Sequence, residues 1–513
     1  MAEWDKVIKT ARLEYEKLEV QKKIDILRDD WDYLLIDELA KQFRPEAYSK
    51  LYWLITKENN IFKRAINELA LVYKQAPVRK ALVGETPDTV YDDIMKSTNK
   101  NTVLKALNKY TLACNHCINY ISFRDGRLDY QVLNFNNADV FVSTEDYQKI
   151  IAIKYYTGLM LDADGSTPIS SDGRVDYTPG RRSIGMKYNT LSYSTAYIWT
   201  ADDVDNKHNE ILTNDSITAL KKGMVYTVKV NTNRQQEQVV KETANPYMNP
   251  DGTPCLPFVI YDRYYPVDQR FDFTTGNDLY DLTINTGVMM MLLNQLMKFQ
   301  SFKQVAMTGI DTDSMPKEIL IDPVQAIALG PNRQGQNPTV SILDLQTDID
   351  RFRKVVEARG ITCLSGYGIS PQNYTMSAQA TSGYALQISN MGKMEAREDQ
   401  IEMYRQREQE LFQKERIIWN HHRPDKMIDV KAELTVDFVE PSYPKSPLEI
   451  AQEYKTLKEY NVITDIDIML EHNPDMTPEE AEAKYYANKK INEKMRISLP
   501  PLEVKENNEP DRQ

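Results

Sequence analysis

The sequence predicts an α+β fold in which a strand-rich stretch lies between two helical parts of the chain. Apolar residues recur at helical spacing up to about residue 80. Between about 120 and 275 the composition becomes that of β-strands separated by turns. Helical spacing returns at about 277 and recurs at 347–359, from Ser382 to about His421 and at 446–496, with short strands at 313–345. The chain of 513 residues is long enough for one large core or for several domains.

The N-terminal part is predicted to be helical as far as Pro77. Its apolar positions at helical spacing are Leu13, Leu18, Ile24, Ile26, Leu27, Leu34, Leu35, Leu39 and Phe43. The segment 44–82 continues this pattern until Pro77. Strands are then predicted within 128–143, 196–204 and 224–233. The stretch 244–265 is predicted to be a loop that leads into a buried strand.

Two helices with a short strand-containing segment between them are predicted next. The first begins near 277, and its heptad frame comprises Leu279, Leu282, Thr286, Met289, Leu293, Leu296 and Gln300. The segment 313–345 contains short strands punctuated by Pro and Gly. The second helix is predicted at 347–359, with Ile349, Phe352, Val355 and Val356 on one face. Gly360 is expected to stop it.

The longest predicted helix starts after Ser382 and runs to about His421. A helix of forty residues measures about 60 Å at a rise of 1.5 Å per residue. Its acidic and basic residues are nearly balanced, and its narrow apolar stripe consists of Leu386, Met394, Ile401, Tyr404, Leu411 and Ile418. A helix of this kind bridges other elements or packs against copies of itself.

A last helical module is predicted at 446–496. Two of its segments open at Ser446 and Thr477 with a capping residue, then Pro, then acid, which is typical of a helix N-terminus. The polar tail 501–513 is predicted to be disordered.

The composition limits the kinds of partner. The net charge is −12, and the acid is spread along the chain, which argues against a protein that reads nucleic-acid sequence. It remains compatible with a protein that lets DNA slide past, because a surface that neutralises few phosphates holds DNA weakly. Tyr (31) outnumbers Phe (13) and Trp (5), which suits half-buried surfaces such as subunit interfaces or reflects compositional bias.

The sequence contains no recognisable anchor for an active site. It has no phosphate-binding P-loop, no G-x-S-x-G and no H-E-x-x-H. The four cysteines, Cys114, Cys117, Cys255 and Cys363, are too few for a disulfide framework and indicate a reducing compartment. The C-x-x-C at 114–117 encloses His116, but four metal ligands cannot be assembled, so buried thiols are expected.

Two other features have ordinary readings as well as functional ones. His421 and His422 lie at a predicted helix end, where a capping cation is favoured over a metal site. The segment 162–166, DADGS, has the wrong spacing for a calcium loop, so a solvated turn is favoured. No cofactor or metal is therefore expected.

No membrane contact is expected either. The charged, amphipathic N-terminus is unlike a signal peptide. The most apolar run, 288–297, is about half the length that a membrane span needs. We therefore expect a soluble protein.

Several stretches, taken in order, resemble one protein family. They are NPYMNPDGTPCLPFVIYDR (245–263), IDRFRKVVEARGITCLSGYGISPQ (349–372), ATSGYALQISNMGKMEAREDQIEMYRQREQELF (380–412) and AQEYKTLKEYNVITDIDIMLEHNPDMTPEEAEAKYYANKKINEK (451–494). Together they resemble the portal (head–tail connector) proteins of tailed double-stranded DNA bacteriophages, in particular the SPP1-type portal family. Asn461 stands where that family usually has Gly, and Asn tolerates the left-handed conformation. The stretch 85–240 carries no such likeness.

The resemblance implies an α+β portal fold with an α/β wing, a two-helix stem, a small β-containing clip, a long spine helix and a helical C-terminal crown. The implied wing is 1–275, with stem helices at 276–301 and 347–369 around a clip at 302–346. A tunnel loop at 370–385 follows, then the spine helix and a return strand at 386–444. The crown is 445–500, and 501–513 is the tail.

The resemblance also implies a function without enzyme activity. Portals form closed rings, usually dodecamers, at one capsid vertex, and double-stranded DNA passes through the channel during packaging and ejection. The implied partners are the terminase large subunit, head–tail adaptor and tail proteins, and the major capsid protein, with synthesis in the host cytoplasm. The alternatives are another structural connector or adaptor of the virion and, less favoured, a phage DNA-processing enzyme.

Two groups of site residues follow from this layout. The tunnel-loop candidates are Asn373, Tyr374, Met376, Ser377, Gln379 and Thr381. The candidate channel-lining cations are Lys298, Lys303, Arg351, Arg353 and Lys354, which the alternative reading places on a solvated outer face. Small loop residues would let several copies crowd around a channel and touch DNA without gripping it.

Overall fold

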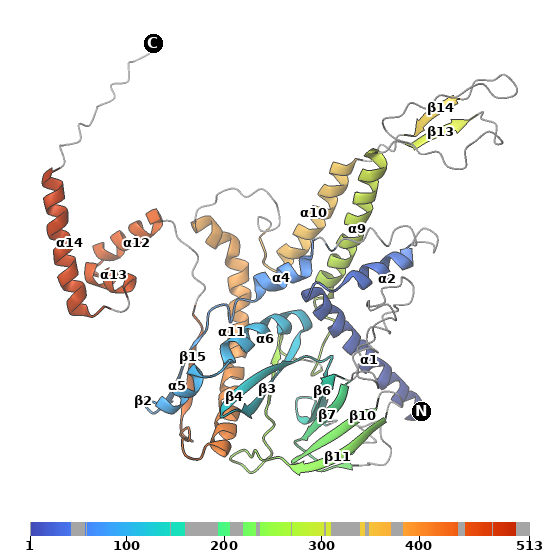
Figure 1. Ribbon diagram of the computed structural model, residues 1–513, viewed down its shortest axis with the longest axis horizontal. Helices are drawn as coiled ribbons and strands as arrows, with labels where there is room; N and C mark the ends of the chain where they lie inside the picture. The colour runs from blue at the N-terminus through green and yellow to red at the C-terminus, as the bar shows by residue number, and fades with distance from the viewer. Residues whose placement is uncertain are drawn as a thin grey trace. The chain divides into compact units, whose positions relative to one another are not determined.

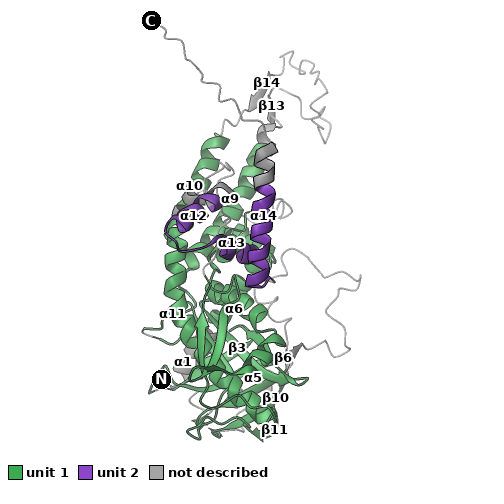
Figure 2. Ribbon diagram, turned by 90° about the vertical axis from the view of Figure 1, so that its left-hand side faces the viewer, with its two compact units in different colours: residues 1–378, 389–441 green, residues 379–388, 442–513 purple. Residues whose placement is uncertain are grey.

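The computed structural model divides the chain into two compact units (Figure 2). Unit 1 comprises residues 1–378 and 389–441, and unit 2 comprises 379–388 and 442–513. The structure describes residues 2–42, 57, 59–143, 145–159, 193–205, 219–231, 236–267, 269–301, 304–308, 339–343, 348–370, 383–439, 447–473 and 476–498. The fold mixes helices with antiparallel sheets, which confirms the predicted α+β class.

The elements of unit 1 follow one another along the chain as Figure 1 shows. Its helices are α1 (Ala2–Leu27), α2 (Asp32–Gln42), α4 (Ile61–Leu69), α5 (Thr89–Lys96), α6 (Lys100–Cys114), α9 (Asn277–Ser301), α10 (Ile349–Gly366) and, from residue 389 onward, α11 (Gly383–His422). Its strands are β1 (Val78–Val83), β2 (Thr86–Pro87), β3 (His116–Arg124), β4 (Arg127–Leu133), β5 (Ala138–Val142), β6 (Ile150–Leu159), β7 (Tyr193–Thr200), β8 (Val204–Asp205), β9 (Ala219–Leu220), β10 (Met224–Asn231), β11 (Gln236–Ala244), β12 (Phe258–Asp262), β13 (Gln304–Thr308), β14 (Thr339–Leu343) and β15 (Glu433–Asp437).

Three sheets make up most of the β structure. The largest has the order β11-β10-β7-β6-β5, and two three-stranded sheets have the orders β12-β3-β4 and β15-β1-β2. The β3–β4 hairpin turns through Asp125 and Gly126, whose φ angles of 51° and 78° are those of an Asp-Gly hairpin turn. Strand β15 pairs with β1, so the chain that follows α11 returns to the N-terminal half.

One large core joins the helices of unit 1 to its sheets. On the five-stranded sheet, Trp199 packs into this main core and the adjacent Ile198 into a smaller cluster on the other face. The alternation follows from the two-residue repeat of a strand. Long helix α11 contributes Tyr404, Leu411, Phe412, Ile418 and Trp419 to the core. This part of its apolar stripe is therefore covered by other segments of the same chain. Here the helix bridges other elements, as one of the two alternatives predicted, instead of packing against copies of itself.

Two sequence predictions about helices are wrong. The helical pattern was expected to reach Pro77, but α4 ends at Leu69, and β1 begins directly after Pro77. Gly360 was expected to stop the second stem helix, but α10 continues to Gly366. Gly360 is buried on the same face as Val356 and Leu364, one turn before it and one turn after it. Burial of this face offsets the low helix propensity of glycine.

Helix α10 ends instead at a Schellman motif. The Ile369 amide donates to Leu364 O at 3.0 Å, and the Gly368 amide donates to Ser365 O at 3.0 Å. Gly368 has a φ of 70°, in the left-handed region that this motif requires. Leu364 and Ile369 are both buried, as is typical of the hydrophobic contact across such a cap.

Unit 2 is a small helical module with helices α12 (Pro447–Glu459), α13 (Asp465–His472) and α14 (Pro478–Ser498). Thr464 and Asp467 form a capping box at α13. Thr477 and Glu480 exchange the same pair of hydrogen bonds at α14, which confirms the predicted helix start. Asn461 has a φ of 55°, so it adopts the left-handed conformation expected at that position.

Candidate functional site

Helices α9 and α10 form an antiparallel pair. Asp278 in the first turn of α9 accepts a hydrogen bond of 2.5 Å from the hydroxyl of Tyr367, at the end of α10. Midway along the pair, Arg359 lies 3.9 Å from the Met289 sulfur. Strand β13 follows α9, β14 precedes α10, and the two strands pair with each other, so a two-stranded sheet connects the helices at one end (Figure 1).

The base of the pair is packed tightly against the N-terminal helices. A Cβ added at Gly287 on α9 would lie 2.7 Å from Leu35 Cδ2 and 3.3 Å from the Trp31 ring. The amide of Phe62 on α4 donates to Thr283 Oγ1 at 2.9 Å. The predicted heptad frame lies partly on this buried side: Leu279, Thr286 and Leu293 are buried, whereas Leu282, Met289 and Leu296 are half-buried.

The face of α10 opposite α9 is exposed and carries small and basic side chains. At about 100° per residue, Arg351, Lys354, Ala358, Thr362 and Ser365 share this face, and all are exposed. Arg353 is also exposed, but it lies on another side of the helix, 3.8 Å from Glu357. Arg359, which the sequence reasoning missed, is a fourth cation on α10.

The other candidate residues lie at the margins of the structure or beyond it. Lys298 is on α9, but its side chain lies outside the described residues, and so does all of Lys303. The tunnel-loop candidates Asn373, Tyr374, Met376, Ser377, Gln379 and Thr381 also lie outside them, as does the segment 162–166. The structure describes both flanks of that loop, however, where Ser370 and Asn390 are buried.

A buried ionic cluster attaches α11 to the sheets and helices of the N-terminal half. The Glu408 carboxylate accepts hydrogen bonds from Arg79 Nη2 at 2.6 Å and from Arg79 Nε at 2.9 Å. Lys100 lies 2.7 Å from Glu415 Oε1 and 3.3 Å from Glu408 Oε2. The two carboxylates are fully buried and opposed by two cations, so the cluster is neutral.

Tyrosine hydroxyls complete this cluster. Tyr73 donates to Glu408 at 2.9 Å, Tyr130 donates to Glu415 at 2.7 Å, and Tyr91 lies 3.5 Å from Glu415. Burial alone would raise the pKa of Glu408, but Lys100, Arg79 and the hydrogen bonds lower it to about 2. These tyrosines are core residues with satisfied hydroxyls, which accounts for part of the Tyr-rich composition without an interface.

A second buried carboxylate, Asp262, lies in the segment that leads into α9. It accepts from His116 Nδ1 at 2.9 Å and from both terminal nitrogens of Arg270 at 2.9 and 3.2 Å. Arg407 on α11 adds a contact of 3.0 Å. His116 Nε2 accepts from the Asp272 amide at 2.8 Å, so the imidazole carries its hydrogen on Nδ1. Burial acts to raise the pKa of Asp262, but His116 and Arg270 outweigh it and lower that pKa.

This arrangement explains the C-x-x-C motif without a metal. Cys114 and Cys117 are buried free thiols, as expected, and burial raises the pKa of Cys114 to about 12. His116 is occupied by Asp262 and by the Asp272 amide. Within the described part of the chain, no group of three or more His, Cys, Asp or Glu side chains could hold a metal ion.

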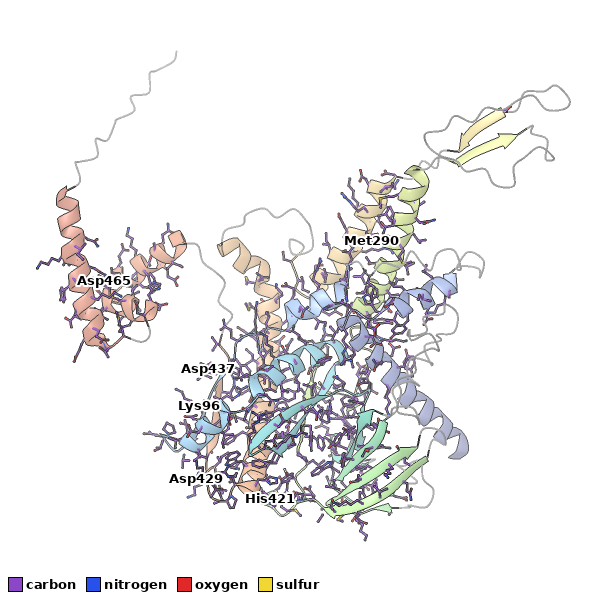
Figure 3. All side chains as sticks on the ribbon, viewed as in Figure 1. Lys96, Met290, His421, Asp429, Asp437 and Asp465 are labelled. Atoms are coloured by element: carbon purple, nitrogen blue, oxygen red, sulfur yellow. The ribbon has the colours of Figure 1, made fainter. Side chains whose placement is uncertain are left out.

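The expectation for His422 is corrected. It was expected to act as a capping cation, but burial and the neighbouring His421 lower the pKa of His422. Its ring stacks on Phe123 at a centroid distance of 4.5 Å, and Nε2 lies 3.0 Å from the Tyr247 hydroxyl. His422 therefore helps to pack the end of α11, where its neighbour His421 is labelled in Figure 3.

An open cavity of about 580 Å³ borders the Asp262 group, and its lining includes His116, Arg270, Tyr264 and Tyr265. Its histidine and arginine are already engaged with Asp262, so neither is placed as a base for a nucleophile.

None of the helices in the described ranges is long and apolar enough to cross a membrane.

Comparisons with known proteins were made at the level of sequence and of structure. No protein-family model matches the chain, and no curated protein matches it. Among solved structures it is similar to a chain of the virion of a native gene transfer agent (GTA) particle, at 10% identity and a TM-score of 0.39, covering 82% of this chain and 91% of that one.

Two further structures are chains of GTA particle necks. A chain from the neck of an empty particle computed with C6 symmetry has 10% identity and a TM-score of 0.36, covering 82% of this chain and 92% of that one. A chain from the neck of a native particle computed with C12 symmetry has 8% identity and a TM-score of 0.38, covering 82% and 91%. TM-scores below 0.5 do not by themselves establish a shared fold.

Proposed function

We propose that this chain is the subunit of an SPP1-type portal, a closed ring at one capsid vertex through which double-stranded DNA is packaged and ejected. The observation that carries the proposal is the antiparallel α9–α10 pair, with β13 and β14 between its helices in the chain and long α11 directly after it. That order is the stem, clip and spine order implied by the motifs in 349–372 and 380–412.

The exposed residues of the stem suit a ring. Met297 and Val355 are large apolar side chains that remain exposed on α9 and α10 in a single copy. A neighbouring copy would remove them from water, and a heterologous contact that closes produces a ring. Among the described strands, β13 and β14 pair only with each other. In the same assembly, they would pair with strands of neighbouring clips.

The charge pattern suits DNA that must move. A net charge of −12 disfavours tight binding, while Arg351 and Lys354 supply a few cations on the free face of α10. In this proposal that face lines the channel and contacts phosphates weakly. The clip and the wing would present surfaces to the terminase large subunit, to the head–tail adaptor and tail proteins, and to the major capsid protein.

The mass of the purified assembly tests the proposal. We expect a ring with a DNA-wide channel in negative-stain images and a mass near twelve times the 59.4 kDa of one chain. A protein that stays monomeric at high concentration contradicts the proposal. Metal-dependent DNA cleavage or ATP hydrolysis by the isolated protein would favour the enzyme alternative instead.

A matched pair of variants tests whether the stem takes part. Val355→Glu replaces an exposed apolar side chain of α10 by a charged one and should lower the fraction of assembled rings. Val240→Glu on β11 is the control, because Val240 is 49% exposed against 47% for Val355 and lies outside the stem. Equal loss of assembly in both variants would exclude a specific stem interface.

A further inference from the structure

Two glycines bring the end of α10 and the body of α11 into backbone contact. A Cβ added at Gly368 would lie 2.8 Å from Gly392 C and 2.9 Å from Gly392 O. A Cβ added at Gly392 would lie 3.1 Å from Gly368 Cα. The first distance is shorter than side chains tolerate against backbone, so Gly368 has no room for a side chain while Gly392 lies this close. The contact at Gly392 is tight as well, because an added Cβ would push Gly368 away by a few tenths of an ångström.

Both sides of this contact are anchored to other elements. Just before Gly368, Tyr367 donates to Asp278 on α9, and the Arg263 guanidinium lies 5.5 Å from the Tyr367 ring centroid. Just after Gly392, the buried ammonium of Lys393 lies 2.7 Å from Glu68 on α4. The glycine contact thus sits where α4, α9, α10 and α11 are joined, with little freedom to shift.

Gly392 is informative because it lies inside a helix. Glycine weakens a helix interior, so alanine at such a position ordinarily stabilises the helix. No positive φ occurs at Gly392, and the backbone conformation therefore does not require glycine there. The close approach of Gly368 to Gly392 is therefore the feature that favours glycine at position 392.

We propose that Gly368 and Gly392 are positioning residues that form a fixed joint between α11 and the α9–α10 pair. The joint sets where the chain leaves α10 at Ser370 and where α11 lies beside that point. Its consequence for DNA rests on the proposed function: if α10 faces the channel, the joint holds the end of α10 at one height relative to α11 in every subunit.

The first test measures hydrogen exchange on the purified full-length protein. In Gly392→Ala, amides around 364–370 and 388–396 should exchange faster than in the wild type, because alanine separates the two segments. Gly368→Ala should act in the same direction and more strongly, since it adds left-handed strain to the clash. Slower exchange in Gly392→Ala, as for an unconstrained helix, would overturn the proposal.

Two variants serve as controls for this test. Gly366→Ala changes the last residue of α10, where an added Cβ meets nothing within 4 Å. Gly126→Ala adds only left-handed strain, because its φ is 78° and its added Cβ also meets nothing within 4 Å. Faster exchange around 388–396 in either control would show that the effect does not come from the joint. If Gly368→Ala fails to fold, Gly392→Ala alone decides the outcome.

The second test measures DNA in particles assembled with each variant. Gly392→Ala should still form rings but yield fewer DNA-filled particles, whereas Gly366→Ala should match the wild type. Rings of Gly392→Ala that fill with DNA normally would overturn the positioning role. The two proposals fail separately: a wild-type protein that forms no ring contradicts the portal function, while the exchange experiment still tests the joint.

Discussion

At the scale of single residues, α11 contacts the N-terminal half of the chain through buried ion pairs as well as through its apolar stripe. Glu408 and Glu415 lie on the same face as Tyr404 and Leu411, and all four are fully or almost fully buried. Each carboxylate has both a cation and a tyrosine hydroxyl within contact distance. An ion pair buried in this way adds little net stability when complete, but the loss of one member leaves an uncompensated charge.

Replacing Glu408 by Gln should therefore destabilise the protein strongly. Arg79 would remain buried without its carboxylate, and breaking a buried pair costs about 3–5 kcal/mol. The control is Glu402→Gln on the same helix, where the exposed pair with Arg405 contributes about 0–1 kcal/mol. Denaturant unfolding measures both, and similar free energies of unfolding for the two variants would contradict the prediction.

The same residue predicts an acid dependence. The pKa of Glu408 is about 2 in the folded protein against an ordinary 4.5, so its ionised form stabilises the fold. That contribution is complete above about pH 4.5 and is lost as the pH falls toward about 2. Unfolding midpoints measured across this window should fall more steeply for the wild type than for Glu408→Gln. Parallel pH profiles would contradict it.

At the scale of elements, α10 combines a buried face with a free one. Val356, Gly360 and Leu364 are buried, whereas the opposite face offers Arg351 and Lys354 among small residues. Sparse cations on an exposed face contact phosphates without sequence preference, and each neutralised phosphate adds to the salt dependence of DNA association.

Removing those cations should weaken DNA association without affecting assembly. In rings carrying Arg351→Ala or Lys354→Ala, the logarithmic salt slope of DNA association should fall by about 1 for each phosphate that the ring no longer neutralises. The control is Lys96→Ala on α5, an exposed cation paired with Asp93 at 3.1 Å and labelled in Figure 3. An equal effect of Lys96→Ala would show that the face of α10 is not special.

At the scale of the whole molecule, the two units differ in how they are stabilised. The main core lies entirely in unit 1, whereas in the described part of unit 2 Ala481 alone is buried. A module of about fifty residues with so small a core does not supply enough burial to offset its conformational entropy. We therefore expect unit 2 to depend on contacts that its own helices do not provide.

The isolated segment 447–498 should accordingly show far less helix by circular dichroism than its three helices would give. Truncation of the chain after 441 is the matched experiment, because it leaves the main core intact. The truncated protein should unfold cooperatively with an unchanged midpoint. A fully helical isolated segment would show that unit 2 is stable without outside contacts.

Local sequence patterns predicted some elements correctly and missed others for identifiable reasons. The heptad at 279, the cap at Thr477 and the turn at Asn461 depend on neighbouring residues, and the structure contains each of them. Strand β3 was missed although Asp125–Gly126 was a usable hairpin signal. Strands β1 and β15 have no local signal for their pairing, since they are joined only by contact between distant parts of the chain.

The sequence by itself determined the α+β class, the long helix after Ser382 and the helical caps, because each follows from short-range periodicity and turn chemistry. Only the tertiary structure decided which segments cover α11, why Gly360 does not end α10, and why Gly368 and Gly392 lie in close backbone contact. Those outcomes depend on what packs against each residue, and packing partners separated by many residues leave no periodic signal in the sequence.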